Sequence, residues 1–298
     1  MNSKPYLQIL LLAVAHLGMV ASGVGQSITS DSLTAGNNYR VAAFRLWLPS
    51  NEKVRGIIVM MPGSNGDGRN LILDTAWQRL AAKHRFALVG CYFTDNKHDN
   101  MDIERYADVK YGSGSALITA LRNLSVRTTH PELATAPLAL WGMSAGGEFN
   151  YEFACWKPER VISFIVNKGG IYYSALTPAA AWEVPGLFIT GERDSPYRNE
   201  IINGIFAINR RFGARWIYAS EPGVAHEFDN SARFARFYFD QLVPIRVTAE
   251  GTLMSLPSSG FIATRHGEIE AEGTNRPAEI TSWFPSRAIA EGWMRFVR

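Results

Sequence analysis

The apolar residues of this chain gather in short, unbroken runs, separated by longer stretches in which they recur at helical intervals. The run at residues 56–61, Gly-Ile-Ile-Val-Met-Met, is typical of a strand buried on both faces of a sheet. Residues 71–84 follow with helical spacing, and residues 86–92 form the next apolar run. Further strands are expected at 136–141, 161–166, 186–190 and 215–219, and further helices at 114–124, 148–156, 199–212 and 232–242. This order predicts an α/β fold with a mostly parallel central sheet and helices on both faces.

Both ends of the chain depart from this alternation. Residues 1–25 combine a lysine, an apolar centre and a small-residue exit, which predicts a secretory signal peptide, with an uncleaved anchor or a buried helix as the alternatives. The apolar centre is short for a membrane span, so we expect no stable span after its removal and a secreted or periplasmic product. Residues 26–298 are expected to form a single domain. Within it, residues 39–48 have the pattern of extended edge structure. Residues 244–298 are expected to form a C-terminal extension packed on the same core, with a lid or a glycan-binding appendage as the alternative.

Charge and cysteine content narrow the possible partners. The net charge is +3, and the basic residues are scattered rather than gathered in a run, so we expect no nucleic-acid partner. The two cysteines, Cys91 and Cys155, are expected to be free thiols. Cys91 lies near the carboxyl end of an expected strand, whereas Cys155 lies far down an expected helix, too distant for a disulfide.

Residues 142–146, Gly-Met-Ser-Ala-Gly, carry the strongest chemical signal of the chain. They lie between an expected strand and an expected helix, and a strand, a Gly-x-Ser-x-Gly turn and a helix together form a nucleophile elbow. Such a turn lifts the serine hydroxyl above the end of a parallel sheet, and its glycines leave room where side chains would collide with neighbouring backbone. Ser144 is therefore the candidate nucleophile.

A serine nucleophile needs a base to take its proton and a carboxylate to orient that base. In this architecture the acid and then the histidine follow the serine, each on a loop after a strand. Asp194 follows the expected strand at 186–190, and His226 follows the one at 215–219, so we assign them as acid and base. Glu192 is the alternative acid, and Asp229 follows the histidine too closely to orient it easily. The other histidines considered are His84 at a helix end, His98 on a long loop and His130 at the opposite end of the sheet.

Two further groups of residues are candidates for the same site, at the carboxyl ends of the expected strands. The oxyanion needs donors, and the backbone N–H of Ala145 is the first because it follows the nucleophile. The second is expected from the glycine-rich loop at 62–68, with the N–H of Ser64 as the candidate. Aromatic residues that follow expected strands could form an acyl or sugar subsite, with core filling as the alternative. They are Tyr92, Phe93, Tyr172 and Tyr173.

No metal or cofactor is expected. The loop at 94–102 gathers carboxylates, amides and one imidazole, but their spacing matches no standard cation site. A solvated loop is the simpler interpretation. A series of nucleophile, base and acid also needs no metal for its chemistry.

These motifs give the chain a family resemblance. It resembles the α/β-hydrolase fold, and within it the secreted esterases that include polyhydroxybutyrate depolymerases and feruloyl or acetylxylan esterases. The resemblance covers roughly residues 40–242 and implies the same triad, Ser144, Asp194 and His226. It rests on the segments 62–66, 142–147 and 191–194, on His226, and on the connection 157–161. The chain departs from that group in having at most one disulfide and in showing no separate polymer-binding module.

The sequence therefore predicts a secreted serine hydrolase that cleaves carboxylic esters through an acyl-enzyme. A small molecule, a polyester or a carbohydrate ester is the expected substrate. Two alternatives remain open. One is a serine peptidase or amidase, because the triad serves both chemistries. The other is a non-catalytic binding protein of hydrolase fold, since a fold does not fix a function.

Overall fold

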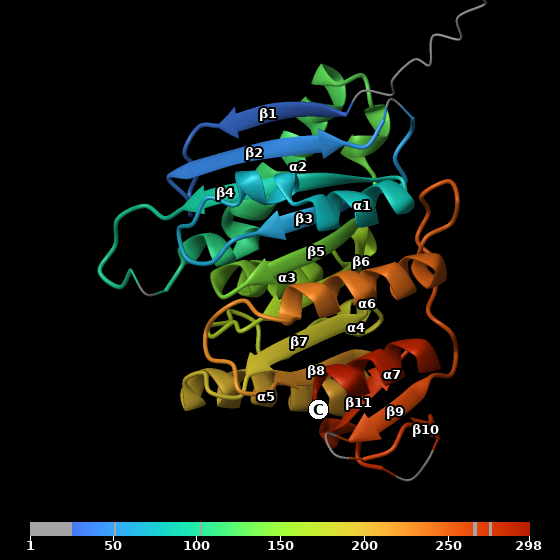
Figure 1. Cartoon of the computed structure of the whole chain (residues 1–298). Coiled ribbons are helices and arrows are strands. Elements are labelled where there is room, and N and C mark those ends of the chain that lie inside the picture. The colour runs from blue at the N-terminus through green and yellow to red at the C-terminus, as the bar shows by residue number, and fades with distance from the viewer. Residues whose placement is uncertain (1–25, 51, 102, 265–266, 274–275) are drawn as a thin grey trace, which may run out of the picture.

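A mixed sheet runs through the centre of the computed structural model, which describes residues 26–50, 52–101, 103–264, 267–273 and 276–298 (Figure 1). The predicted signal peptide at 1–25 lies outside the described residues. The sheet has eight strands in the order β1-β2-β4-β3-β5-β6-β7-β8. They are β1 Ser27–Leu33, β2 Val41–Leu48, β3 Gly56–Met61, β4 Phe86–Thr94, β5 Leu138–Met143, β6 Val161–Asn167, β7 Gly186–Gly191 and β8 Trp216–Glu221. Strands β3 to β8 run parallel, as predicted, and β2 runs antiparallel to both of its neighbours, β1 and β4.

The strand predicted at the edge of the sheet is not at the edge. β2 pairs with β4 on one side and with β1 on the other, so β1 forms that edge. The residues of β1, Ser-Ile-Thr-Ser-Asp-Ser-Leu, are mostly polar and half exposed, and hydrophobic pattern alone did not identify them as a strand. Backbone pairing along the whole of β1 with residues 42–48 of β2 holds this strand in place.

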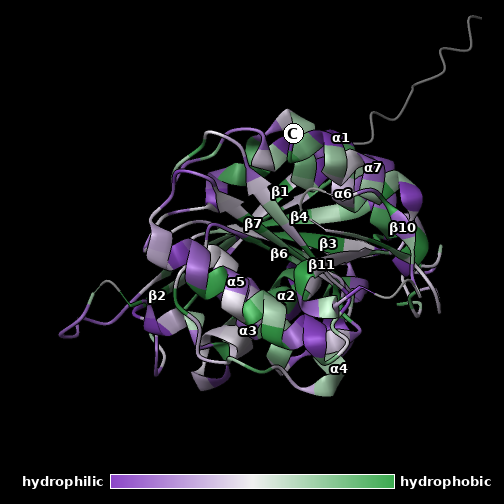
Figure 2. Cartoon of the chain, turned by 90° about the horizontal axis from the view of Figure 1, so that it is seen from below, coloured by the Kyte–Doolittle hydropathy of each residue, from purple (hydrophilic) through white to green (hydrophobic). Residues whose placement is uncertain are grey.

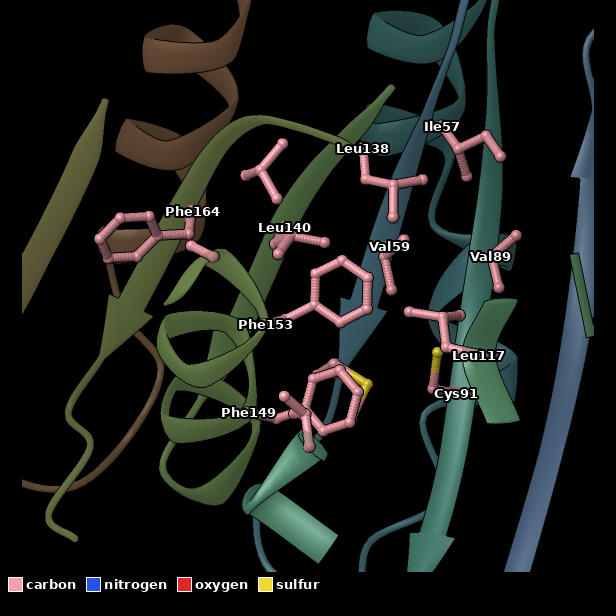
Figure 3. Close-up of a cluster of buried hydrophobic side chains, with 14 of the residues drawn as sticks. Ile57, Val59, Val89, Cys91, Leu117, Leu138, Leu140, Phe149, Phe153 and Phe164 are labelled. Carbon is pink, nitrogen blue, oxygen red and sulfur yellow. The ribbon is translucent and has the colours of Figure 1, made fainter. Parts of the chain in front are cut away.

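Helices cover both faces of the sheet, as the alternating pattern predicted. On one face lie α2 Ser113–Arg127, α3 Ala145–Trp156 and α5 Pro196–Arg211, which share one hydrophobic cluster with the strands. Figure 3 shows part of this cluster, with Phe149 and Phe153 of α3 packed on Val59 and Leu140 of the sheet. On the other face lie α1 Thr75–Lys83, α6 Ser231–Arg246 and α7 Arg287–Phe296. Figure 2 shows the hydrophobic strands between helices with hydrophilic outer faces.

Local capping decides where the first α-helix begins. The helix predicted at 71–84 is two elements, a 3₁₀ turn at Arg69–Leu73 and then α1. The carboxylate of Asp74 accepts the backbone N–H groups of Ala76 and Trp77, so the α-helix begins after that residue. A further short helix, α4 Ala179–Trp182, lies between β6 and β7 and was not predicted.

The C-terminal segment packs beside β8, the last strand in the order of the sheet. α6 continues through Pro244 to Arg246, four residues beyond the helix end predicted at 242, and Val243 and Arg246 are buried. A small sheet in the order β10-β9-β11 then forms from β9 Phe261–Thr264, β10 Glu270–Ala271 and β11 Thr281–Phe284. The indole of Trp293 on α7 donates a 2.8 Å hydrogen bond to the carbonyl of Tyr218 on β8.

Two further sequence predictions can be compared with the structure. Cys91 is buried and Cys155 is half-buried, and both are free, as predicted. Burial raises the pKa of both thiols. Within the described residues, every helix is too short or too polar to span a bilayer.

Candidate active site

Ser144 sits in a strained turn between β5 and α3. Its φ of 53° and ψ of −128° lie in a region that non-glycine residues rarely adopt. Its backbone N–H donates a 2.8 Å hydrogen bond to the carbonyl of Asn167 at the end of β6. Positions 142 and 146 have no room for a side chain, so Gly142 and Gly146 are required there. A Cβ at Gly146 would lie 2.4 Å from the carbonyl oxygen of Pro62, and one at Gly142 would lie 2.5 Å from the backbone of Gly146.

Asp194 and His226 form a hydrogen-bonded pair. Oδ2 of Asp194 lies 2.8 Å from Nδ1 of His226, and the aspartate side chain is 2% exposed while the histidine ring is 35% exposed. The other carboxylate oxygen accepts the N–H of Ser195 at 2.7 Å, so the carboxylate is held from both sides. Because the bond occupies Nδ1, the imidazole keeps Nε2 for a second proton partner.

The turns that carry Ser144, Asp194 and His226 all follow the carboxyl ends of parallel strands, namely β5, β7 and β8. The N–H of Arg193 donates to the carbonyl of Val224 at 2.9 Å, which ties the aspartate turn to the histidine loop. In the described part of the chain, the Ser144 hydroxyl makes no hydrogen bond to His226. Such contacts are often long in an unliganded site and tighten only around a substrate.

The alternative acid and the other histidines have different partners. A carboxylate oxygen of Glu192 accepts the N–H of Gly223 at 2.6 Å, and Asp229 accepts from the side chain of its neighbour Asn230. The three other histidines considered above each meet a carboxylate away from the elbow: His84 with Asp240, His98 with Asp95 and His130 with Glu132.

The helix and the loop that carry the two predicted oxyanion donors, Ala145 and Ser64, both lie beside the nucleophile. Ala145 is the first residue of α3, and its N–H is one of the amides that a helix leaves without an internal partner. The loop at 62–68 runs past the elbow, since a Cβ at Gly63 would be 3.6 Å from the Cβ of Ser144. Asn65, with φ +49°, holds this loop, because its N–H donates to the Tyr106 hydroxyl at 3.2 Å and its side chain accepts from the N–H of Asp95 at 2.8 Å.

Ser144 opens into a polar cavity of about 430 Å³. Its lining residues are Ser64, Met101, Glu104, Ser144, Glu148, Ile171, Tyr197 and Arg198. Sequence reasoning missed Glu104, Glu148, Tyr197 and Arg198. A signal existed for Glu148 alone, since it lies four residues after Ser144 and therefore on the same side of α3.

The charges of this cavity come from two carboxyl groups and a guanidinium. Burial raises the pKa of Glu148 to about 7, although its Oε1 accepts the N–H groups of Gly170 and Ile171 at 2.7 and 2.9 Å. Burial also raises the pKa of Glu104. Arg198 favours the ionised form of both carboxyl groups. A ligand in this cavity would therefore meet hydrogen-bond donors and acceptors rather than an apolar wall.

The predicted aromatic subsite does not form around Ser144. Phe93 is 1% exposed and stacks on Tyr106 and Phe149, so its assignment to substrate binding was wrong, because the residue points into the core. Tyr172 packs edge-on against Tyr151.

The other two aromatic residues of that group lie near the surface. Tyr92 lies under the Arg69 guanidinium. The Tyr173 hydroxyl donates to the carbonyl of Glu104 at 3.0 Å, and Tyr173 lines a second cavity of about 440 Å³. None of these four aromatic residues lines the cavity that holds Ser144.

The polar loop after β4 uses its side chains for its own structure. The Asp95 carboxylate accepts the N–H groups of Arg105 and Tyr106, each at 3.0 Å, and contacts Nε2 of His98 at 3.1 Å. Across the described residues, His, Cys, Asp and Glu nowhere gather in a group of three that could hold a metal ion.

Comparison with solved structures identifies the fold. An S-formylglutathione hydrolase from Agrobacterium tumefaciens superposes with a TM-score of 0.57 at 14% identity, covering 75% of this chain and 96% of that one. A ferulic acid esterase superposes with a TM-score of 0.52 at 12% identity, covering 74% of this chain and 96% of that one. No family model and no curated protein sequence matches the chain. The chain thus has the α/β-hydrolase fold that its sequence predicted.

Proposed function

We propose that this protein is a serine hydrolase that cleaves carboxylic esters through an acyl-enzyme. The observation that carries the proposal is the buried Asp194 carboxylate bonded to Nδ1 of His226, on the same edge of the sheet as a serine held in a strained elbow. A solvent-facing histidine that only stabilised the fold would not need a buried acid dedicated to its orientation.

In the proposed reaction, Ser144 Oγ attacks the ester carbonyl carbon while Nε2 of His226 takes the hydroxyl proton. Asp194 stabilises the resulting imidazolium. The backbone N–H groups of Ala145 and Ser64 stabilise the tetrahedral oxyanion. The C–O bond to the alcohol breaks as His226 returns the proton to the leaving oxygen. Water then attacks the acyl-enzyme by the same route and releases the acid.

The cavity favours a small or polar ester over one with a long alkyl chain. Burying an alkyl chain against Glu104, Glu148 and Arg198 would remove water from charged groups without replacing their hydrogen bonds. A carbohydrate ester or another hydroxylated small molecule fits this lining better. The two solved neighbours are named as an S-formylglutathione hydrolase and a ferulic acid esterase, which supports ester cleavage without fixing the acyl or alcohol group.

Two alternatives compete with this proposal. A peptidase or amidase would use the same residues, and a binding protein would use the cavity without the chemistry.

We also propose that the protein is secreted or periplasmic, on the pattern of residues 1–25.

A substrate panel tests the function. p-Nitrophenyl esters of rising chain length are compared with feruloyl esters, acetylated sugars and p-nitroanilides, with Ser144→Ala as the control. We expect turnover of short or hydroxylated esters that disappears in Ser144→Ala. Faster cleavage of anilides would favour the peptidase, and activity that survives Ser144→Ala would contradict the proposal.

A further inference from the structure

A buried ion pair lies at the carboxyl ends of the parallel strands, beneath the candidate active site. Lys168, which follows β6, and Glu221, the last residue of β8, have side chains that are 0% and 2% exposed. Their Nζ and Oε2 atoms are 2.6 Å apart. Removing two charges from water is costly, and a buried ion pair is weak evidence for a contribution to stability. The contacts of the pair therefore matter more than its existence.

The lysine holds the turn that fixes the nucleophile. Lys168 Nζ also donates to Oδ1 of Asn167 at 3.1 Å, and the Asn167 carbonyl accepts the N–H of Ser144. Lys168 has φ +55°, a backbone angle that residues other than glycine rarely adopt. Its own N–H donates to the carbonyl of Ile189 on β7 at 2.7 Å. The ends of β5, β6 and β7 are joined at this one residue and its neighbour.

The glutamate closes the loop that carries His226. That loop begins after Glu221 and ends at Ser231, the first residue of α6. Oε1 of Glu221 accepts the N–H of Ser231 at 2.9 Å. The Ser231 hydroxyl in turn accepts the side-chain amide of Asn167 at 3.1 Å. One carboxylate therefore fixes both ends of the histidine loop and links them to the turn beside Ser144.

The aspartate turn is fitted against the same lysine. A Cβ at Gly191, where the turn to Asp194 begins, would lie 3.0 Å from Cε of Lys168 and 2.4 Å from the carbonyl oxygen of Ala225. The Glu192 N–H also donates to the backbone carbonyl of Glu221 at 3.0 Å. The lysine stem, the aspartate turn and the histidine loop are thus packed without spare room.

We propose that Lys168 and Glu221 are positioning residues that set the Ser144 turn, the Asp194 turn and the His226 loop relative to one another. This inference rests on the proposed function. The pair touches no substrate, and it acts through Asn167 and Ser231. A displacement of about 1 Å in a catalytic group is enough to reduce turnover about 100-fold.

The test separates stability from turnover. Lys168→Met and Glu221→Gln are made singly and together, and thermal midpoint, kcat and KM are measured on an ester from the panel above. Each single variant leaves one charge buried and unpaired, so its midpoint falls, whereas the double variant removes both charges and recovers most of the midpoint. If the pair positions the site, kcat stays about 10- to 100-fold low in the double variant, while KM changes less than about twofold.

A matched control is Arg210→Met. Arg210 is 5% exposed and donates to backbone carbonyls of Ala214 and Thr281, far along α5 from the elbow. Its loss is expected to lower the thermal midpoint and leave kcat of the folded enzyme unchanged. If the double variant does not fold, Glu221→Gln carries the test, since its side-chain carbonyl can still accept the Ser231 N–H.

Three further outcomes would count against these proposals. A kcat that recovers together with the midpoint in the double variant would show a merely structural role and overturn the proposal. A folded Glu221→Gln enzyme with the kcat of the wild type would do the same. A wild-type enzyme that cleaves no ester and shows no dependence on Ser144 would instead remove the proposed function, and this inference with it.

Discussion

Glu192 and Asp194 lie two residues apart in the turn after β7, yet only Asp194 contacts His226. The Asp194 carboxylate is buried against the imidazole, whereas that of Glu192 accepts the backbone N–H of Gly223. Either acid was compatible with the order of residues along the chain. The geometry favours Asp194 as the orienting acid of the proposed triad.

A pair of isosteric substitutions tests this assignment. Asp194→Asn should reduce kcat by several orders of magnitude with little change in fold, because the amide can stabilise the wrong imidazole tautomer. Glu192→Gln should keep kcat within about threefold, since its carbonyl can still accept from Gly223. Steady-state kinetics on both variants decide between them. If Asp194→Asn changed kcat little and Glu192→Gln reduced it severely, the orienting acid would be Glu192 instead of Asp194.

The elbow glycines should tolerate no side chain. Gly146→Ala would place a methyl group 2.4 Å from the Pro62 carbonyl oxygen, so β3 or α3 must move. We expect a loss of about 2 kcal/mol or more of unfolding free energy and a severe loss of kcat. Gly204→Ala is the control, because that helical position is open and Ala raises helix stability by about 0.5–1 kcal/mol. Equal denaturation midpoints for the two variants would contradict the close approach at the elbow.

The Glu148 carboxyl should make stability depend on pH. Burial raises its pKa from 4.5 to about 7, so the folded state favours the neutral form. The associated stability is complete below about pH 4.5 and is lost as the pH rises through 7. Glu148→Gln keeps an acceptor for Gly170 and Ile171 and should flatten this part of the profile, which amounts to about 1–3 kcal/mol.

Urea denaturation of the wild type and Glu148→Gln between pH 4.5 and 8 measures this effect. The wild type should lose stability relative to the variant as the pH rises. Parallel profiles over the whole range would show that folding leaves the pKa of this carboxyl group unchanged.

Phe93 should behave as a core residue rather than as a substrate contact. Phe93→Ala removes a ring that stacks on Tyr106 and Phe149 and should cost about 3–5 kcal/mol of unfolding free energy. The KM of the folded variant should change little, because the ring lies outside the Ser144 cavity. A variant with normal stability and a raised KM would restore Phe93 to the substrate pocket.

The sequence predicted the parts of the molecule that local pattern determines. Continuous apolar runs identified the parallel strands, and the strand, Gly-x-Ser-x-Gly turn and helix located Ser144, because that geometry is confined to a few adjacent residues. β1 was missed because its polar residues are held by backbone pairing with β2 rather than by burial.

Contacts between distant segments were not predictable from pattern. Phe93 and Tyr92 are neighbours on one strand, and only the packing on each face shows that Phe93 points into the core. Glu104, Glu148 and Arg198 come from three separate segments that meet at the cavity only after folding. The Lys168–Glu221 pair likewise spans two strands, and neither residue belongs to a recognisable motif.

The central claim is that Ser144 is a covalent nucleophile activated by His226. Mass spectrometry of the intact protein after treatment with a fluorophosphonate tests it most directly, with peptide mapping to locate the adduct. We predict one adduct on the wild type, located at Ser144, and none on Ser144→Ala or on a heat-unfolded sample. An unmodified wild type, or an adduct that persists in Ser144→Ala, would contradict the account.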